Sequence, residues 1–143
     1  MKFTTITQLP ASDLVRARAW YKEKLGIEQV TADGELFEPG DADPWTYALD
    51  YDSGTARFSV YQTPHAGKNP ATAMRLVTDE FDAVHTELLA RGVVFEIYDV
   101  DESFHEPDGT PYWENGALIS PDGEKTAWFK DSEGNVIAVG SCR

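Results

Sequence analysis

The chain has 143 residues, of which 41% are hydrophobic and 12% aromatic, the size and composition of one ordinary globular domain. Its formal net charge of −13 repels phosphate backbones, so we expect no nucleic-acid partner. No window approaches the roughly 18 apolar residues of a membrane-spanning helix, so we expect no membrane contact. Such acidity keeps a protein soluble, an interpretation that we favour over the steering of a cationic ligand.

The cysteine content and the N-terminal residues indicate the compartment. Cys142 is the single cysteine, so the chain has no internal disulfide, which fits a reducing environment. Residues 1–5 run into a strand-like segment without a charged-then-apolar leader. The sequence therefore predicts a cytoplasmic protein.

A strand and a helix are the first predicted elements. Residues 3–9 are rich in β-branched types, which is typical of a strand. Ser12 or Asp13 can accept hydrogen bonds from the first amides of a helix over residues 14–25. Gly26 follows as the expected left-handed helix stop. The apolar positions of this helix form one stripe, made of Leu14, Ala17, Tyr21 and Leu25.

The same order of elements occurs a second time. A strand over residues 74–77 precedes Asp79 at the start of a second helix, and Gly92 ends that helix. Asp79 and Gly92 are 13 residues apart, as are Asp13 and Gly26. A further short strand follows each helix. The second helix has its own apolar stripe, made of Phe81, Val84 and Leu88.

Each half then ends in a predicted hairpin with a three-residue loop that contains glycine. The first hairpin pairs residues 45–51 with 55–61, and the second pairs 126–130 with 135–139. The order in each half is β-α-β-β-β, so one helix covers one face of each sheet. We therefore predict an α+β protein with two tandem βαβββ modules.

The predicted domain organisation is a single domain over residues 1–143. The first module covers 1–65 and the second covers 70–143, with a long loop at 99–121 in the second module alone. A loop of this length in a compact domain is usually functional or disordered. Its aromatic residues favour a functional role, and a mobile acidic surface flap is the alternative.

Two segments of the chain resemble one known family. Residues 9–26 resemble the opening module of the vicinal oxygen chelate superfamily, and residues 127–135 resemble its closing hairpin. This superfamily contains glyoxalase I, extradiol dioxygenases, fosfomycin-resistance enzymes and bleomycin-binding resistance proteins. The resemblance covers nearly the whole chain and implies a cupped mixed sheet with the helices on its outer face. It is weak for the reaction, because this scaffold supports many chemistries.

The resemblance also implies a divalent metal site, which this sequence does not match. The family's enzymes take His, Gln or Glu ligands from the first and last strands of each module. Those positions should be Ile6, Ser59, Ala73 and Ala138 here, and none is a competent ligand. Gln8 is the nearest candidate, and one amide does not make a site. We expect neither a metal nor another cofactor.

The remaining reactive side chains do not form a familiar catalytic arrangement. No HxH or HExxH spacing occurs. His85, on the second helix, is predicted to be solvated; His65 lies in the linker between the modules and His105 in the long loop. No Ser/His/Asp or Cys/His arrangement is visible, and Cys142 is a poor candidate for a nucleophile.

The alternation of residues along the two hairpins predicts which side chains share the inner face. Tyr47 and Leu49 are expected on the face of Ser59, and Trp128 on the face of Ala138. Phe58, Val60, Phe129 and Ile137 are then expected on the face that the helices cover. The predicted ligand-binding residues are Tyr47, Arg57, Tyr61, Arg75, Trp113 and Trp128. Aromatic sites of this kind hold flat organic ligands, so the predicted partner is a small molecule.

Three functions stay open at this stage. The first is a metal-independent binding protein that sequesters a small aromatic molecule, as the bleomycin-binding members do. The second is an enzyme with an atypical or metal-free site, in which a tyrosine, His105 or a loop carboxylate acts as acid or base. The third is a diverged member without a ligand.

Two expectations concern partners of the predicted site. A ligand anion or an internal carboxylate must compensate the arginines of the inner face, and we favour the internal carboxylate. We also expect a homodimer, because two four-stranded modules leave sheet edges that pairing would cover.

Overall fold

The computed structural model describes residues 1–30, 48–99 and 112–142. The chain forms two compact units. The first unit contains Met1–Pro70 together with Asp131–Asn135, and the second contains Ala71–Lys130 and Val136–Arg143. In the described ranges no helix is long and apolar enough to cross a membrane.

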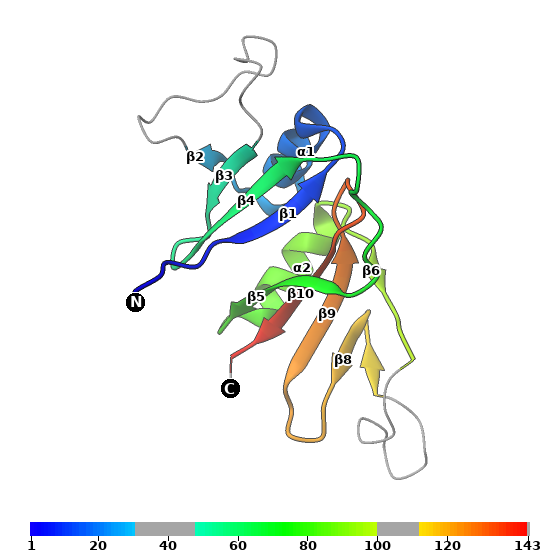
Figure 1. Cartoon of the computed structure of the whole chain (residues 1–143). Helices are drawn as coiled ribbons and strands as arrows, with labels where there is room; N and C mark the ends of the chain where they lie inside the picture. The colour runs from blue at the N-terminus through cyan, green and yellow to red at the C-terminus, as the bar shows by residue number, and fades with distance from the viewer. Residues whose placement is uncertain (31–47, 100–111, 143) are drawn as a thin grey trace. The chain divides into compact units, whose positions relative to one another are not determined.

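The first unit is a four-stranded sheet with one helix (Figure 1). Its strand order is β1-β4-β3-β2, in which β1 runs parallel to β4 and the other neighbours are antiparallel. Its elements are β1 (Thr7–Ala11), α1 (Leu14–Trp20), the π-helical turn η1 (Tyr21–Leu25), β2 (Gln29–Val30), β3 (Ala48–Asp52) and β4 (Arg57–Gln62).

The ends of the first helix lie where the sequence predicts them. Asp13 is the N-cap, and its side chain accepts a hydrogen bond from the amide of Arg16 at 3.0 Å. Gly26 ends the helix with φ of 68°, the left-handed conformation that glycine adopts without strain. The last turn, η1, is π-helical, a departure from the regular helix that was expected over 14–25.

An aromatic cluster joins this helix to its sheet. The Tyr21 ring lies 5.0 Å from that of Tyr51 and 5.7 Å from that of Phe58, between ring centroids. Tyr51 and Phe58 stack on each other at 5.1 Å. The Tyr21 hydroxyl donates to the Asp131 carboxylate at 2.8 Å, which satisfies its polar end inside the cluster.

The register of the first hairpin differs from the prediction. A four-residue turn over residues 53–56 places Asp52 opposite Arg57, so that Leu49 pairs with Val60 and Asp50 with Ser59. Leu49 therefore lies on the helix-covered face, where it is buried, and the prediction that it shares the face of Ser59 is wrong. A turn that is one residue longer moves every side chain of the strand to the opposite face of the sheet.

The turn between the last two strands belongs to the first unit. Its Glu133 side chain accepts hydrogen bonds from the amides of Ser12 and Asp13, at 2.9 and 3.0 Å, and from both Nε and Nη2 of Arg16. Burial alone would raise the pKa of Glu133, but these bonds and one from Ser132 outweigh it and lower the pKa to about 2. The free amides before α1 thus receive a charged acceptor from a residue 120 positions away.

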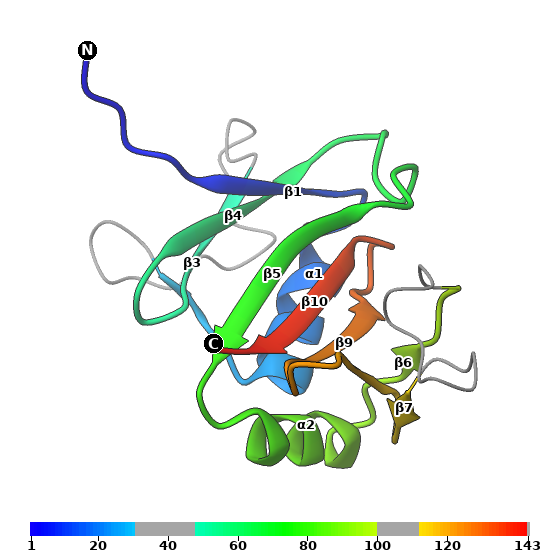
Figure 2. The ribbon, with the colours of Figure 1, turned by 90° about the horizontal axis from the view of Figure 1, so that it is seen from below.

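The second unit is a six-stranded mixed sheet with one helix, and Figure 2 shows α2 along one face of it. Its strand order is β5-β10-β9-β8-β7, with β6 paired to β9, and β5 is parallel to β10. Its elements are β5 (Thr72–Thr78), α2 (Phe81–Ala90), β6 (Phe95–Glu96), β7 (Trp113–Glu114), β8 (Ala117–Ile119), β9 (Lys125–Lys130) and β10 (Val136–Ser141).

The second hairpin has the predicted register. Ala138 pairs with Trp128 and Ile137 with Phe129, so Trp128 lies on the face of Ala138 as expected. Phe129 and Ile137 are fully buried on the face that α2 covers. The second helix begins one residue later than predicted, because Glu80 is its N-cap and Thr78 Oγ1 accepts from the Glu80 amide in front of it.

Two further predictions about the second unit are wrong. His85 is buried, at 7% exposure, because it lies between the rings of Phe81 and Phe95.

The segment 99–121 is not one loop, since its described C-terminal part forms the β7–β8 hairpin. An Asn-Gly turn at residues 115–116 makes that hairpin, and this dipeptide was the sequence signal for it. His105 lies outside the described residues.

Candidate functional site

The candidate site lies on the open face of the second sheet, by which we mean the face opposite α2. Residues paired across neighbouring strands share a face. One paired row runs across four strands from Arg75 through Ala138 and Trp128 to Glu96. The adjacent row of the same face consists of Val77, Gly140, Thr126, Leu118 and Trp113.

Three aromatic rings meet on this open face around Trp128. The Trp113 ring lies 6.1 Å from the Trp128 ring between centroids, with an angle of 58° between the planes. The Tyr98 ring lies 6.0 Å from the Trp128 ring between centroids, edge-on at 89°. All three side chains are partly exposed. The result is an aromatic surface of tilted rings in contact with solvent.

An ion pair borders the aromatic surface. Lys130 Nζ lies 3.0 Å from the Glu96 carboxylate, which also accepts a hydrogen bond from the Tyr98 hydroxyl. Burial and the neighbouring carboxylate raise the pKa of Tyr98 to about 12. The hydrogen bonds from Tyr98 and Lys130 lower the pKa of Glu96. At neutral pH Tyr98 is therefore protonated and Glu96 ionised.

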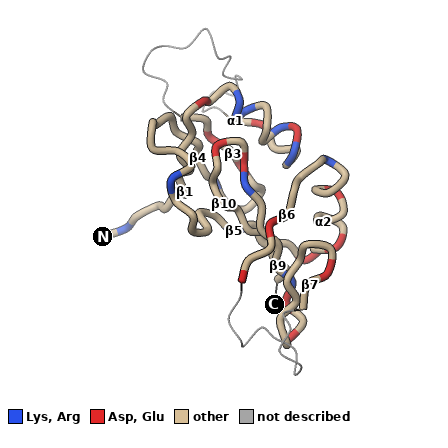
Figure 3. The backbone as a smooth tube through the Cα atoms, turned by 90° about the vertical axis from the view of Figure 1, so that its right-hand side faces the viewer, with Lys and Arg blue, Asp and Glu red and all other residues tan. Residues whose placement is uncertain are grey.

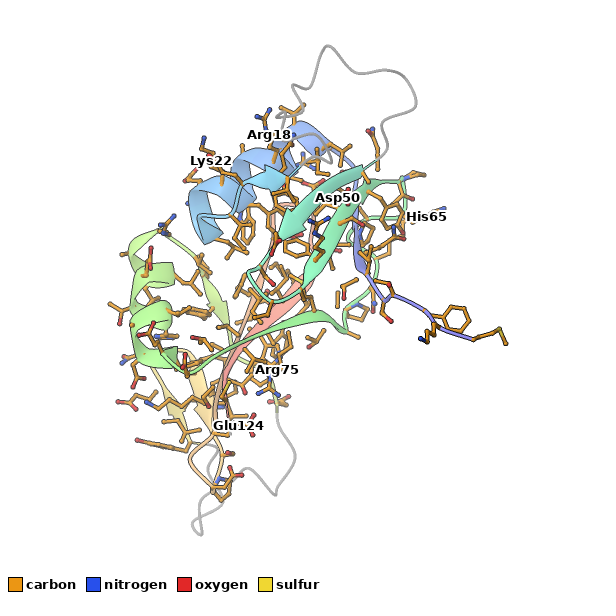
Figure 4. All side chains as sticks on the ribbon, turned by 90° about the vertical axis from the view of Figure 1, so that its left-hand side faces the viewer. Arg18, Lys22, Asp50, His65, Arg75 and Glu124 are labelled. Atoms are coloured by element: carbon orange, nitrogen blue, oxygen red, sulfur yellow. The ribbon has the colours of Figure 1, made fainter. Side chains whose placement is uncertain are left out.

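Arg75 lies over β10 on the same open face. Its guanidinium occupies the space above Gly140, where a Cβ atom would stand 2.5 Å from Nη2 and 2.8 Å from Nε. Nη2 bonds to the Glu124 carboxylate, and Figure 4 shows the two side chains next to each other. The preference for an internal carboxylate as the partner of this arginine is confirmed. A side chain at position 140 would therefore collide with the guanidinium in this conformation.

The six predicted ligand-binding residues fall into three groups. Arg75, Trp113 and Trp128 share the open face of the second sheet. Arg57 and Tyr61 lie with Ser59 on the face of the first sheet opposite α1, which we call its open face, and Arg57 Nε lies 3.8 Å from Asp52. Tyr47 lies outside the described residues.

The sequence analysis missed Tyr98, Glu96 and Glu124. Glu96 lies on β6 and pairs with Trp128, whereas Tyr98 lies beyond the end of that strand and reaches Trp128 only through the fold. Glu124 likewise precedes β9 and meets Arg75 only through the fold.

The residues at the family's metal positions do not fit a metal ion. The register pairs Ser59 with Gln8 in the first sheet and Ala138 with Arg75 in the second, and the predicted positions Ile6 and Ala73 lie two residues before these partners. An amide, a hydroxyl, a guanidinium and a methyl group do not make a set of metal donors. Within the described ranges no three His, Cys, Asp or Glu side chains are grouped so as to hold an ion.

A small cavity in the first unit is a poor alternative site. It has a volume of about 20 Å³, room for about one water molecule. Arg18 and Lys22 line it from the first helix, where Figure 4 shows them, together with Glu28 and Gln29. Lys22 Nζ bonds to Glu28 at 2.7 Å, so the charge of this lysine is already compensated. An organic ligand does not fit this cavity.

Two βαβββ-like modules, each with a helix on one face of a mixed sheet, define the class of protein to which this fold belongs. Residues 4–139 match the model of the Glyoxalase/Bleomycin resistance protein/Dioxygenase superfamily. The chain belongs to this superfamily, and both the predicted resemblance and the predicted fold class are confirmed.

Solved structures share the fold at low identity. A lactoylglutathione lyase from Agrobacterium tumefaciens is 19% identical with a TM-score of 0.63, and the match covers 99% of this chain and 94% of that one. The antibiotic binding protein TnmS3 from Streptomyces sp. CB03234 is 22% identical, with a TM-score of 0.56 and coverage of 100% and 99%. A bleomycin-binding protein complexed with bleomycin is 15% identical, with a TM-score of 0.63 and coverage of 99% and 100%. No curated protein matches the chain.

Proposed function

We propose that this protein binds a flat aromatic molecule on the open face of its second sheet, without a metal ion, and sequesters it. The observation that carries the proposal is the contact of Trp128 with Trp113 and Tyr98. Partly exposed aromatic rings that meet at an angle offer both a face and an edge to a planar ligand. Burial of such a ligand against them gains roughly 25 cal/mol per Å² of apolar surface.

The charges beside the rings support binding over acid–base catalysis. A general acid or base works best when its pKa lies near the working pH. The pKa of Tyr98 is raised to about 12 and that of Glu96 is lowered, so both move away from neutrality. Lys130 and Arg75 each have a carboxylate partner. These charged groups near the aromatic surface thus form ion pairs, in which each basic side chain has an acidic partner.

The neighbouring structures include proteins named for what they bind. One is described as an antibiotic binding protein and another was solved with bleomycin. These names support sequestration of a small molecule on the same scaffold. Similarity to the lactoylglutathione lyase would support an enzyme instead. The pKa shifts of Tyr98 and Glu96 do not add to that support, because both pKa values move away from neutral pH.

Two measurements test the proposal. Native mass spectrometry of the purified chain detects a co-purifying small molecule directly. Titration with 2-naphthol and with 9-aminoacridine, followed by tryptophan fluorescence, measures binding of a neutral and a cationic planar probe. We expect saturable binding that Trp113→Ala weakens and that Trp20→Phe, on the first helix, leaves unchanged. Equal affinities of the wild type and Trp113→Ala would exclude the proposed site.

The absence of a metal is a separate part of this proposal. It is supported by the side chains at the family's metal positions, which do not fit a metal ion. Elemental analysis of the purified protein should show far less than one Zn, Ni, Fe or Mn per chain. One equivalent of metal that a chelator removes with loss of probe binding would contradict it.

We also propose that the protein is a homodimer. Residues 1–6 lie outside any strand, and Phe3 and Ile6 are exposed at 85% and 50%. Among the described strands β1 and β5 are edge strands of their sheets, and pairing with a second copy of the chain would cover such edges. Light scattering at micromolar concentration should give twice the 15.9 kDa of the chain. A mass near 15.9 kDa would refute the dimer, and Phe3→Ser should shift the equilibrium toward monomer.

A further inference from the structure

We infer that His85 is a positioning residue that holds the β7–β8 hairpin, and with it Trp113, against α2. The inference deepens the proposed function and rests on it, because Trp113 belongs to the proposed site. His85 lies on the side of the sheet opposite to the aromatic surface, so its effect on Trp113 is indirect.

His85 lies in an apolar stack between the helix and the sheet. Its imidazole is stacked on the Phe95 ring, with centroids 4.5 Å apart and planes 11° apart, and on the Phe81 ring at 5.5 Å and 21°. Nε2 has no hydrogen-bond partner among the described residues. A buried polar atom in such a stack is costly and calls for an explanation. Histidine is therefore not the residue that packing alone would select at this position.

The β7–β8 turn rests on this stack. Asn115 and Gly116 have φ of 50° and 84°, which is the pattern of a type I′ turn. A Cβ atom at position 116 would lie 2.9 Å from Cβ of Phe95, so the turn backbone packs directly against that residue. Phe95 in turn stacks on His85, so the turn packs against the stack that His85 completes.

The same hairpin carries Trp113 on its other face. Trp113 lies two residues before Asn115 and pairs with Leu118 across the hairpin. It therefore points to the open face, where its ring lies 6.1 Å from that of Trp128. Because the hairpin is only a few residues long, a shift of its turn changes the position of Trp113 relative to Trp128. The stack of His85 on Phe95, against which the turn packs, is in this way coupled to the aromatic surface.

Protonation of His85 should weaken this anchoring. Burial lowers the pKa of His85, and hydrogen bonding with the Asn115 backbone opposes the shift only in part. Asp82 on α2 raises the pKa and Lys125 on β9 lowers it, and these two residues form an ion pair at 2.6 Å. Glu114 on β7 and Tyr112 also act on Lys125. The charges nearby largely offset one another, so acid places an uncompensated cation in the apolar stack.

A pH titration of the full-length protein tests the inference without any ligand. The indole resonance of Trp113, assigned from Trp113→Phe, should shift with a midpoint below the ordinary histidine pKa of about 6.5. The shift should be lost in both His85→Gln and His85→Phe, the second of which keeps an aromatic ring in the stack. It should persist in His65→Gln, because His65 is exposed and lies in the first unit. A Trp113 resonance that is independent of pH, or that titrates equally in His85→Phe, would overturn the inference.

Probe binding separates this inference from the proposed function. Between pH 7.5 and 5 the affinity of the wild type for 2-naphthol should fall about fivefold, and that of His85→Phe should stay constant. If Trp113→Ala binds 2-naphthol as well as the wild type does, the proposed site is wrong, while the Trp113 resonance still reports the anchoring. If the wild type loses affinity with acid and His85→Phe loses it equally, the positioning role of His85 is wrong.

Discussion

The two units of the protein have similar helix-covered faces and different open faces. In the first unit, Tyr21, Tyr51 and Phe58 pack between helix and sheet, and in the second His85, Phe95 and Phe129 do so. The open face of the first sheet carries the polar residues Asp50, Asp52, Arg57 and Ser59, of which Ser59 is buried, and the aromatic Tyr61. The open face of the second carries Trp113 and Trp128. Burial under a helix constrains a face to apolar packing in both modules, whereas an open face can diverge toward a ligand.

The two helices also begin differently. The N-terminus of α1 receives the buried Glu133 carboxylate in addition to its own cap, Asp13. The N-cap of α2 is Glu80, which makes no side-chain capping bond. Figure 3 shows a difference in charge as well, with basic residues along α1 and acidic residues along α2. The start of the helix in the first module therefore receives its charged acceptor from Glu133, a residue far along the sequence.

The largest expected effect comes from removing that carboxylate. Glu133→Ala leaves the amides of Ser12 and Asp13 and the Arg16 guanidinium without their acceptor. We expect a loss of about 3 kcal/mol of unfolding free energy, since a buried charge with several bonds is removed. Urea denaturation followed by circular dichroism measures it. The control Glu87→Ala, which breaks only the surface pair with Arg91, should cost about 0.5 kcal/mol or less.

Acid should affect the wild type through the same residue. The pKa of Glu133 is lowered from 4.5 to about 2 in the folded protein, so between these values the unfolded chain binds more protons. Its contribution to stability is thus present above about pH 4.5 and is lost as the pH falls toward 2. The unfolding free energy of Glu133→Gln should depend less on pH in this window. Parallel pH curves for the two proteins would contradict the assignment.

A pair of tyrosines in the first unit gives an intermediate effect. Tyr21→Phe removes the 2.8 Å bond from the hydroxyl to the buried Asp131 carboxylate, and should cost about 1.5–2 kcal/mol. The Tyr51 hydroxyl, in the same cluster, is buried and has no hydrogen-bond partner among the described residues. Tyr51→Phe should therefore be neutral or slightly stabilising. Equal losses in the two variants, measured by thermal unfolding, would show that ring packing rather than the hydrogen bond decides.

The smallest expected effect sharpens the comparison of the two open faces. Trp113→Ala should weaken binding of 2-naphthol about tenfold, or about 1.4 kcal/mol, with little change in melting temperature. Trp128→Ala should weaken both binding and folding, because this residue stands on a central strand. Tyr61→Ala, on the open face of the first sheet, should weaken binding less than Trp113→Ala does. The reverse order would move the site to the first sheet.

The sequence by itself determined the repeated order of elements, the cap at Asp13, the glycine stop at Gly26 and the inward face of Trp128. These features depend on neighbouring residues, on helical spacing or on the alternation of a strand, all of which are local. The face of Leu49 was local too, but a turn one residue longer than expected inverted it.

Only the tertiary structure decided which distant groups meet. Glu133 reaches Ser12 and Asp13 across about 120 positions of sequence, and Glu124 reaches Arg75 across 49. The burial of His85 likewise required Phe95, from the strand after its helix, to close the stack. No periodicity records such contacts, because they depend on how strands far apart in sequence are placed in one sheet.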